Sequence, residues 1–142
     1  MAMFIYKTGV YPISLETASA RITLNQDGSI QLSMGATEIG QGADTVFTQM
    51  ASQTTGIAFD KVYIVSTQDT DVTPFDTGAY ASRQTYVSGM ACKKCGEEFR
   101  HKILEYAAYM LNHDVTDLSR TVYAEEVMAA GMRIREALAF MR

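Results

Sequence analysis

Two short alternating segments on either side of a turn constrain the fold of this chain more than any other feature. Apolar and polar residues alternate over residues 18–25 and again over residues 30–34. This period is typical of strands that bury one face. The residues between them, Asn25-Gln26-Asp27-Gly28, are common turn formers. The sequence therefore predicts a β-hairpin.

Helical periodicity follows the hairpin. A Gly-rich loop over residues 35–42 leads into an apolar helical face that ends near Gly56, and residues 61–65 predict a third strand. Residues 69–84 have little periodicity and predict a loop. Helices are predicted over residues 86–113 and 123–141. The core face of the first of these is predicted to hold Phe99, Ile103, Tyr106, Ala107 and Met110.

The composition limits the class of protein. The chain has 142 residues, of which 47% are hydrophobic, and its formal net charge is −4. No large positive field is available for nucleic acid or an anionic membrane, and no apolar run approaches the roughly 18 residues of a spanning helix. We expect a soluble cytoplasmic protein with one α+β domain over residues 1–142, made of a hairpin and a third strand packed with about three helices. Because three strands are few for three helices, we expect a fragment of a larger domain whose sheet continues elsewhere.

The Gly-rich loop lies between a predicted strand and a predicted helix. Such a loop offers main-chain N–H groups and the positive end of the helix dipole to an anion. Gly40 and Gly42 would let a ligand approach the main chain, and the Gln41 amide can donate to and accept from a heterocycle or phosphate. The alternative is a tight turn that binds nothing, and the pattern alone leaves both open. Ala43 and Thr45 stand where a dinucleotide-binding loop would have glycine, and Ala43 stands where a Walker loop would have lysine, so neither fingerprint is present.

A second candidate loop covers residues 76–85 and also leads into a helix. Its small residues leave room for a ligand, and its polar side chains can donate hydrogen bonds to oxygens. The alternative is a capped helix start with Ser82 or Thr85 as the cap. Two such helix starts in one small domain are expected to converge on one anionic ligand.

Cys92 and Cys95 have the spacing of half a zinc site or of a redox pair. A structural zinc needs four ligands, and only His101 and His113 could supplement the cysteines. These histidines are about 18 Å apart at the helical rise. Two ordinary helix residues are therefore the favoured interpretation, with zinc or redox chemistry as the alternatives.

Taken together, the two loops resemble those of the molybdenum hydroxylases, the xanthine dehydrogenase and aldehyde oxidase family. Residues 35–42, Gly-Ala-Thr-Glu-Ile-Gly-Gln-Gly, are similar to that family's Gly-Gly-Thr-Glu-Met-Gly-Gln-Gly stretch. Residues 77–89, with Ala81-Ser82 and Gly89, are similar to its second pterin loop, and the hairpin turn matches as well. The resemblance runs from about residue 6 to residue 111 and is strongest to the molybdenum-binding subunit of bacterial purine hydroxylases. Residues 118–142 do not match the pattern.

The resemblance implies a molybdopterin cofactor, which is often extended to a cytosine dinucleotide in bacteria. Ala81 is implied to lie beside the molybdenum without being a ligand, and no catalytic residue is implied in this chain. The implied cofactor-binding residues are Ile39, Gly40, Gln41, Gly42, Ala81, Ser82, Arg83 and Gln84.

The implied reaction is the hydroxylation of an electron-poor carbon of a purine or an aldehyde with the help of a glutamate base. Electrons would leave through 2Fe-2S clusters to FAD on partner subunits or domains. The family's Phe-Arg-Gly and Gly-x-Gly-Glu loops are not found here, and no cysteine set could hold an iron–sulfur cluster. We therefore predict one part of such an enzyme, inactive alone, whose partners include the rest of the molybdenum subunit.

Two other functions remain open at this point. The first is a cofactor-free assembly module of the same fold that forms a homodimer through apolar faces rich in the chain's nine methionines. The second is a binder of a small phosphate ligand, which free nucleotides would stabilise against heat.

Overall fold

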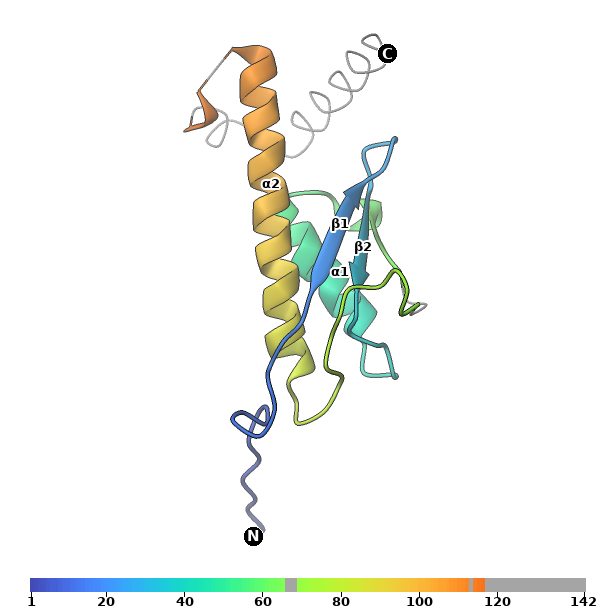
Figure 1. Cartoon of the computed structure of the whole chain (residues 1–142), viewed down its shortest axis with the longest axis vertical. Helices are drawn as coiled ribbons and strands as arrows, with labels where there is room; N and C mark the ends of the chain where they lie inside the picture. Colours follow the sequence, from blue (N-terminus) through green and yellow to red (C-terminus); the bar gives the residue numbers. More distant parts are fainter. Residues whose placement is uncertain (66–68, 113, 117–142) are drawn as a thin grey trace.

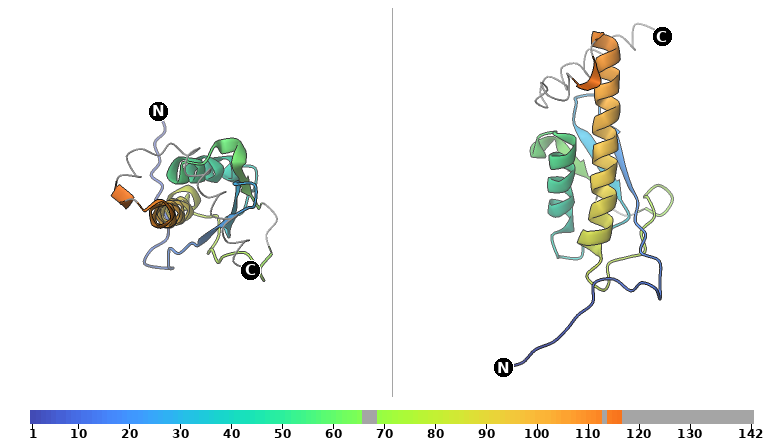
Figure 2. Two further views of the ribbon diagram at one scale, coloured as in Figure 1. Left: turned by 90° about the horizontal axis from the view of Figure 1, so that it is seen from above. Right: turned by 90° about the vertical axis from the view of Figure 1, so that its left-hand side faces the viewer.

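The computed structural model describes residues 1–65, 69–112 and 114–116 as an α+β unit (Figure 1). Its sheet has the order β1-β2-β3, with β1 at Ala20–Leu24, β2 at Ile30–Met34 and β3 at Val62–Ile64. The helices α1, at Ala43–Thr55, and α2, at Gly89–Leu111, pack against each other on one face of this sheet (Figure 2). Helix α2 lies over β1, and α1 lies over β3.

The predicted hairpin is confirmed. Strands β1 and β2 are antiparallel, with Leu24 opposite Ile30 and Ala20 opposite Met34. The turn is closed by Asp27, whose carboxylate accepts a hydrogen bond of 3.0 Å from the Ser29 N–H, and Gly28 adopts the positive φ of 85° that a side chain would disfavour. The predicted third strand is also confirmed, and it pairs in parallel with β2.

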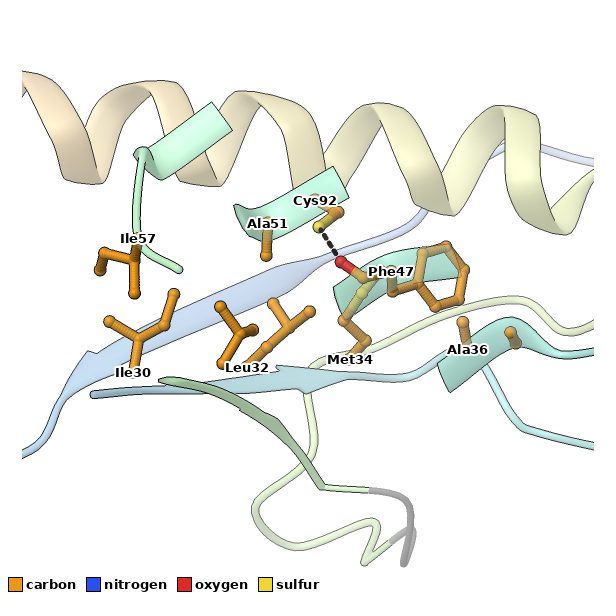
Figure 3. Close-up of a cluster of buried hydrophobic side chains, with 10 residues drawn as sticks. Ile30, Leu32, Met34, Ala36, Phe47, Ala51, Ile57 and Cys92 are labelled. Atoms are coloured by element: carbon orange, nitrogen blue, oxygen red, sulfur yellow. Dashed lines mark hydrogen bonds between the residues drawn. The ribbon is translucent and has the colours of Figure 1, made fainter. Parts of the chain in front are cut away.

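The core lies between the inner face of the sheet and the two helices (Figure 3). Ile30, Leu32 and Met34 are at most 1% exposed, as the alternation over residues 30–34 predicts. Phe47 and Ala51 of α1 cover them and are fully buried. The hairpin alternation and the helical face after the Gly-rich loop therefore meet in one core.

Helices α1 and α2 approach closely at glycines of α2. A Cβ atom on Gly96 would lie 2.0 Å from the Thr54 hydroxyl oxygen, so no larger residue fits between the helices there. Cys92, one turn before Gly96, is fully buried, and its thiol lies 3.7 Å from the Phe47 carbonyl oxygen (Figure 3). Burial raises the pKa of the Cys92 thiol to about 12. This environment agrees with the interpretation of Cys92 as an ordinary helix residue.

The second helix differs from its prediction in two respects. Helical backbone begins at Gln84 with a π-helical turn, Gln84–Ser88, that continues into α2. The distal part of α2 projects beyond the sheet (Figure 1), so Tyr106 and Met110, which were predicted to be in the core, are 61% and 46% exposed. The helix predicted over residues 123–141 lies outside the described residues.

In the described parts of the chain, no helix is both long enough and apolar enough to span a bilayer.

Candidate functional site

The two glycine-bearing loops meet at one end of the molecule, beside the first residues of α1 and the π-helical turn (Figure 1). The Gln41 side-chain amide donates a hydrogen bond of 2.6 Å to the Gln84 amide oxygen. Gln84 in turn donates one of 2.8 Å to the Thr37 carbonyl. Between the loops lies a pocket of about 390 Å³ lined by Ile39, Gln41 and residues 79–85. The expected convergence of the loops is therefore confirmed.

The first loop is shaped by a carboxylate of its own. Glu38 accepts hydrogen bonds from the N–H groups of Gly40, Gly42 and Asp44, at 2.7, 3.1 and 3.0 Å. These bonds, above all that from Asp44, hold the pKa of Glu38 below its ordinary value. The start of α1 thus already carries a negative charge. An internal carboxylate therefore occupies three of the N–H groups expected to be open to a ligand, and the binding of an external anion by this loop stays a prediction.

The apex of the first loop remains accessible. Gly40 and Gly42 have φ values of 98° and 83°, and a Cβ atom on either would meet nothing within 4 Å. The Gln41 amide is engaged within the protein, because its oxygen accepts from the Ile39 N–H at 2.7 Å and its nitrogen contacts Thr37 and Gln84. Across the described residues, the main-chain N–H of Gln41 has no hydrogen-bond acceptor.

The second loop contains two consecutive strained residues. Ala81 and Ser82 have φ values of 46° and 52°, a left-handed conformation that costs a non-glycine residue roughly 1–3 kcal/mol. The Ala81 carbonyl accepts a hydrogen bond of 2.7 Å from the Gly9 N–H. The N–H groups of Ala81 and Ser82 have no acceptor within the part of the chain that the structure describes. Strain maintained beside a pocket is typical of functional sites.

The guanidinium of Arg83 is engaged within the protein. Its side chain is fully buried, and its guanidinium binds Glu16, Asp76 and two main-chain carbonyls. The guanidinium is therefore engaged within the protein, residue 83 lines the pocket, and the binding of a cofactor by Arg83 stays a prediction. Sequence reasoning missed Glu16 altogether, because nothing in the sequence indicates a contact across 67 residues.

A larger groove continues from the pocket, which it meets at Ser82 and Thr85. It has a volume of about 1100 Å³ and runs between the outer faces of α1 and α2. Lys93 and Arg100 lie along it, and Lys93 is 3.7 Å from Glu97. The groove is therefore a long extension of the pocket with cationic groups on one wall.

Two further contacts between charged or titratable groups lie on the exposed face of helix α2. His101 lies 3.2 Å from Glu105. Lys102 lies 2.7 Å from Glu98. These residues, each one turn apart on the helix, are exposed.

Comparison with known proteins identifies the family. The profile of the molybdopterin cofactor-binding domain matches residues 1–140. The chain belongs to this family. It is 49% identical over 119 residues to the putative xanthine dehydrogenase molybdenum-binding subunit of Escherichia coli K12, covering 84% of this chain and 16% of that protein. It is 37% identical over 118 residues to the probable hypoxanthine oxidase of the same organism, covering 83% and 12%.

Solved structures support the same fold. This member of the molybdopterin cofactor-binding domain family superimposes on the CO dehydrogenase of Oligotropha carboxidovorans with a TM-score of 0.66 at 32% identity, covering 71% of this chain and 12% of that one. Quinoline 2-oxidoreductase from Pseudomonas putida 86 has a TM-score of 0.67 at 20% identity, over 80% and 16% of the two chains. The chain thus spans less than a fifth of the proteins that it matches.

Proposed function

We propose that this chain supplies two cofactor-binding loops to a molybdenum hydroxylase of the xanthine or hypoxanthine dehydrogenase type. The observation that carries the proposal is the convergence of the two loops on one pocket, with Gln41 and Gln84 in direct contact. The identity to the two Escherichia coli proteins supports a purine substrate. An aldehyde is the other substrate class that the sequence suggests.

The residues at the pocket suit a cofactor that is both flat and anionic. Gly40 and Gly42 have open space where a side chain would be, so a pterin ring can approach the main chain beside Ile39. The N–H groups of Gln41, Ala81 and Ser82 can donate to the oxygens of its phosphate arm. When bound, the cofactor supplies the oxidation chemistry, and the residues of this chain bind and orient it. The short side chain of Ala81 leaves space for the metal centre.

The side-chain amides of Gln41 and Gln84 have a different role in this proposal. They connect the two loops and so fix the width of the pocket before the cofactor arrives.

We extend the proposal to the cytosine dinucleotide form of the cofactor. The groove that continues from the pocket at Ser82 and Thr85 has about 1100 Å³, room for an additional nucleotide. On its wall, Arg100 and Lys93, the latter 3.7 Å from Glu97, can compensate phosphate charge. Acid hydrolysis of the loaded protein tests this extension, because the dinucleotide form releases one equivalent of cytidine monophosphate per pterin. Release of pterin alone would contradict it.

The proposed partners are the rest of a molybdenum subunit and subunits or domains that carry 2Fe-2S clusters and FAD. Exposed apolar side chains support packing against a larger body: Met3, Phe4 and Ile5 in the N-terminal segment, and Tyr109 at the end of α2, are each more than 80% exposed. Exposed apolar surface of this kind marks protein interfaces.

A titration of the 142-residue chain with molybdopterin, followed by amide NMR, tests the main proposal. We expect shifts that concentrate in residues 39–42 and 79–85. Gln41→Ala removes the amide contact that joins the two loops and should weaken binding about tenfold, because the pocket is then less preorganised, whereas Gln31→Ala, a matched change on the exposed side of β2, should not.

Two results would contradict the main proposal. One is an absence of shifts in both loops at saturating cofactor. The other is dimerisation, seen by light scattering, that is indifferent to Gln41→Ala in a chain that binds no cofactor, which would favour the assembly module.

A further inference from the structure

A buried ionic cluster lies directly behind the second loop. Arg83 is fully buried and pairs with Glu16 through Nε and with Asp76 through Nη1, the latter at 2.8 Å. The same guanidinium donates to the Gly78 carbonyl and the Thr17 carbonyl, both at 2.6 Å. One buried cation thus has four acceptors, two of them charged, of which Asp76 is buried and Glu16 is partly exposed.

The carboxylates of the cluster bind main-chain and side-chain groups on both sides of Ala81 and Ser82. Asp76 accepts from the Gly78 N–H at 2.8 Å, before the strained pair, and from the Ser88 hydroxyl at 2.6 Å, after it. Glu16 accepts from the Val10 N–H, in the same segment whose Gly9 N–H binds the Ala81 carbonyl.

The strained pair itself has little direct support. Its carbonyl bond to Gly9 is the one main-chain hydrogen bond recorded for Ala81 and Ser82 among the described residues. A left-handed conformation persists only where the surroundings impose it. For this pair, the surroundings are the two ends of the loop, and the Arg83 side chain holds both ends in place.

We propose that Arg83 is a positioning residue of the cofactor loop. By binding Glu16, Asp76 and the carbonyls of residues 17 and 78, it holds Ala81 and Ser82 in the left-handed conformation that leaves their N–H groups unpaired at the pocket. The relevance of this role to the cofactor rests on the proposed function. The role itself is a property of the chain without cofactor and can be measured there.

The geometry of the acceptors requires arginine. Four acceptors are spread around a planar fork, and a lysine ammonium keeps the charge but cannot meet them all in that arrangement. Arg83→Lys therefore tests positioning while it limits the damage that two uncompensated carboxylates would cause. Glu16→Gln is a second and milder variant, because an oxygen acceptor for Nε is retained. Arg21→Lys is the matched control: Arg21 is an exposed arginine that also donates to a loop carbonyl, that of Val72 at 2.9 Å.

The first measurement uses NMR of the full chain without cofactor. A positive φ brings the amide proton close to its own Hα, so Ala81 and Ser82 should show strong intraresidue Overhauser effects in the wild type. We expect these effects to weaken in Arg83→Lys and Glu16→Gln, with the shifts of the sheet and α2 retained, and to persist in Arg21→Lys. Unchanged effects in both Arg83→Lys and Glu16→Gln would overturn the proposal. If Arg83→Lys does not fold, Glu16→Gln decides the outcome.

The second measurement is molybdopterin affinity under conditions where every variant is fully folded. Arg83→Lys should lower the affinity at least tenfold, and Arg21→Lys should change it less than twofold. A wild-type chain without affinity would contradict the proposed function and leave the conformational result to decide the role of Arg83. Equal affinity of wild type and Arg83→Lys, in a chain that does bind, would overturn the proposal.

Discussion

The two loops that meet at the pocket are held in shape by different physical means. In the first loop, Glu38 bonds to N–H groups within six residues of itself, and the left-handed positions are glycines, Gly40 and Gly42. In the second loop, the left-handed positions are Ala81 and Ser82, and Arg83 reaches an acceptor 67 residues away. The first loop is a local structure with little strain. The second is a strained structure that depends on the fold around it.

This difference determines how many segments of the chain a substitution should disturb. A change in the first loop should alter that loop and leave the rest of the chain folded. A change at the anchor of the second loop should affect the N-terminal segment, the loop and the beginning of the helix together, because all three contact one buried cluster.

Arg83→Met should have the largest effect on stability. It leaves the buried carboxylate of Asp76 and the partly exposed carboxylate of Glu16 without their cation, and breaking a buried ion pair such as that with Asp76 costs about 3 to 5 kcal/mol. Urea denaturation measures the loss in the free energy of unfolding. Arg21→Met, on the exposed face of β1, should remain within about 0.5 kcal/mol of wild type. Similar losses of stability in Arg83→Met and Arg21→Met would contradict the account in which the second loop depends on a buried anchor.

Gly35→Ala should have the next largest effect. A Cβ atom there would lie 2.4 Å from the Pro74 carbonyl oxygen and 2.7 Å from the Asp76 Cβ, so it should cost about 1 to 3 kcal/mol by overpacking. Gly89→Ala is the control, because its Cβ would meet the flexible end of Met50. It should be neutral or stabilising, since alanine favours a helix over glycine. The reverse order in urea melts would contradict this account.

Glu38→Gln should have a smaller and local effect. The variant keeps an oxygen acceptor but loses the charge that favours the start of α1. We expect faster amide hydrogen exchange at Gly40, Gly42 and Asp44, and unchanged exchange in residues 79–88. Glu98→Gln, on the exposed face of α2, should leave amide exchange unchanged in both loops. Faster exchange in both loops of Glu38→Gln would show that the first loop is not a local structure.

Of these changes, a moderate lowering of the pH from neutral should have the smallest effect on the free energy of unfolding. The pKa values of Glu16 and Glu38 are lowered in the folded chain, each mainly by a main-chain hydrogen bond. Their stabilising contributions should be complete above the ordinary value of 4.5 and be lost as the pH falls through the lowered folded-state pKa. Urea melts over roughly pH 3 to 7 should show a shallower decline in Glu38→Gln. An identical decline in the variant would contradict the role of Glu38.

Much of the fold could be predicted because local patterns determine it. The alternation around Asn25-Gln26-Asp27-Gly28 placed both strands of the hairpin, and the helical spacing up to Gly56 placed α1, which ends at Thr55. The prediction for the distal part of α2 was wrong, because periodicity identifies an apolar face but does not indicate where the sheet beneath the helix ends.

Only those features of the site that depend on neighbouring residues in the sequence could be predicted. Glycines and polar residues between a strand and a helix indicated both loops, and the resemblance indicated their common ligand. The contacts of the Glu38 and Arg83 side chains could not be predicted from the sequence in this way. A glutamate beside a helix start either caps it or leaves it free, and an arginine in a polar loop faces a ligand or the protein interior depending on partners as distant as Glu16.

The Glu38 carboxylate at the start of α1 also has a consequence for selectivity. A helix terminus with vacant amides would attract any small oxyanion of the cell, inorganic phosphate and sulfate included. Here that position carries a fixed negative charge, which repels such ions. Under the proposed function, recognition is thereby left to the neighbouring amides of the two turns, and we expect these to favour a large ligand that can touch both.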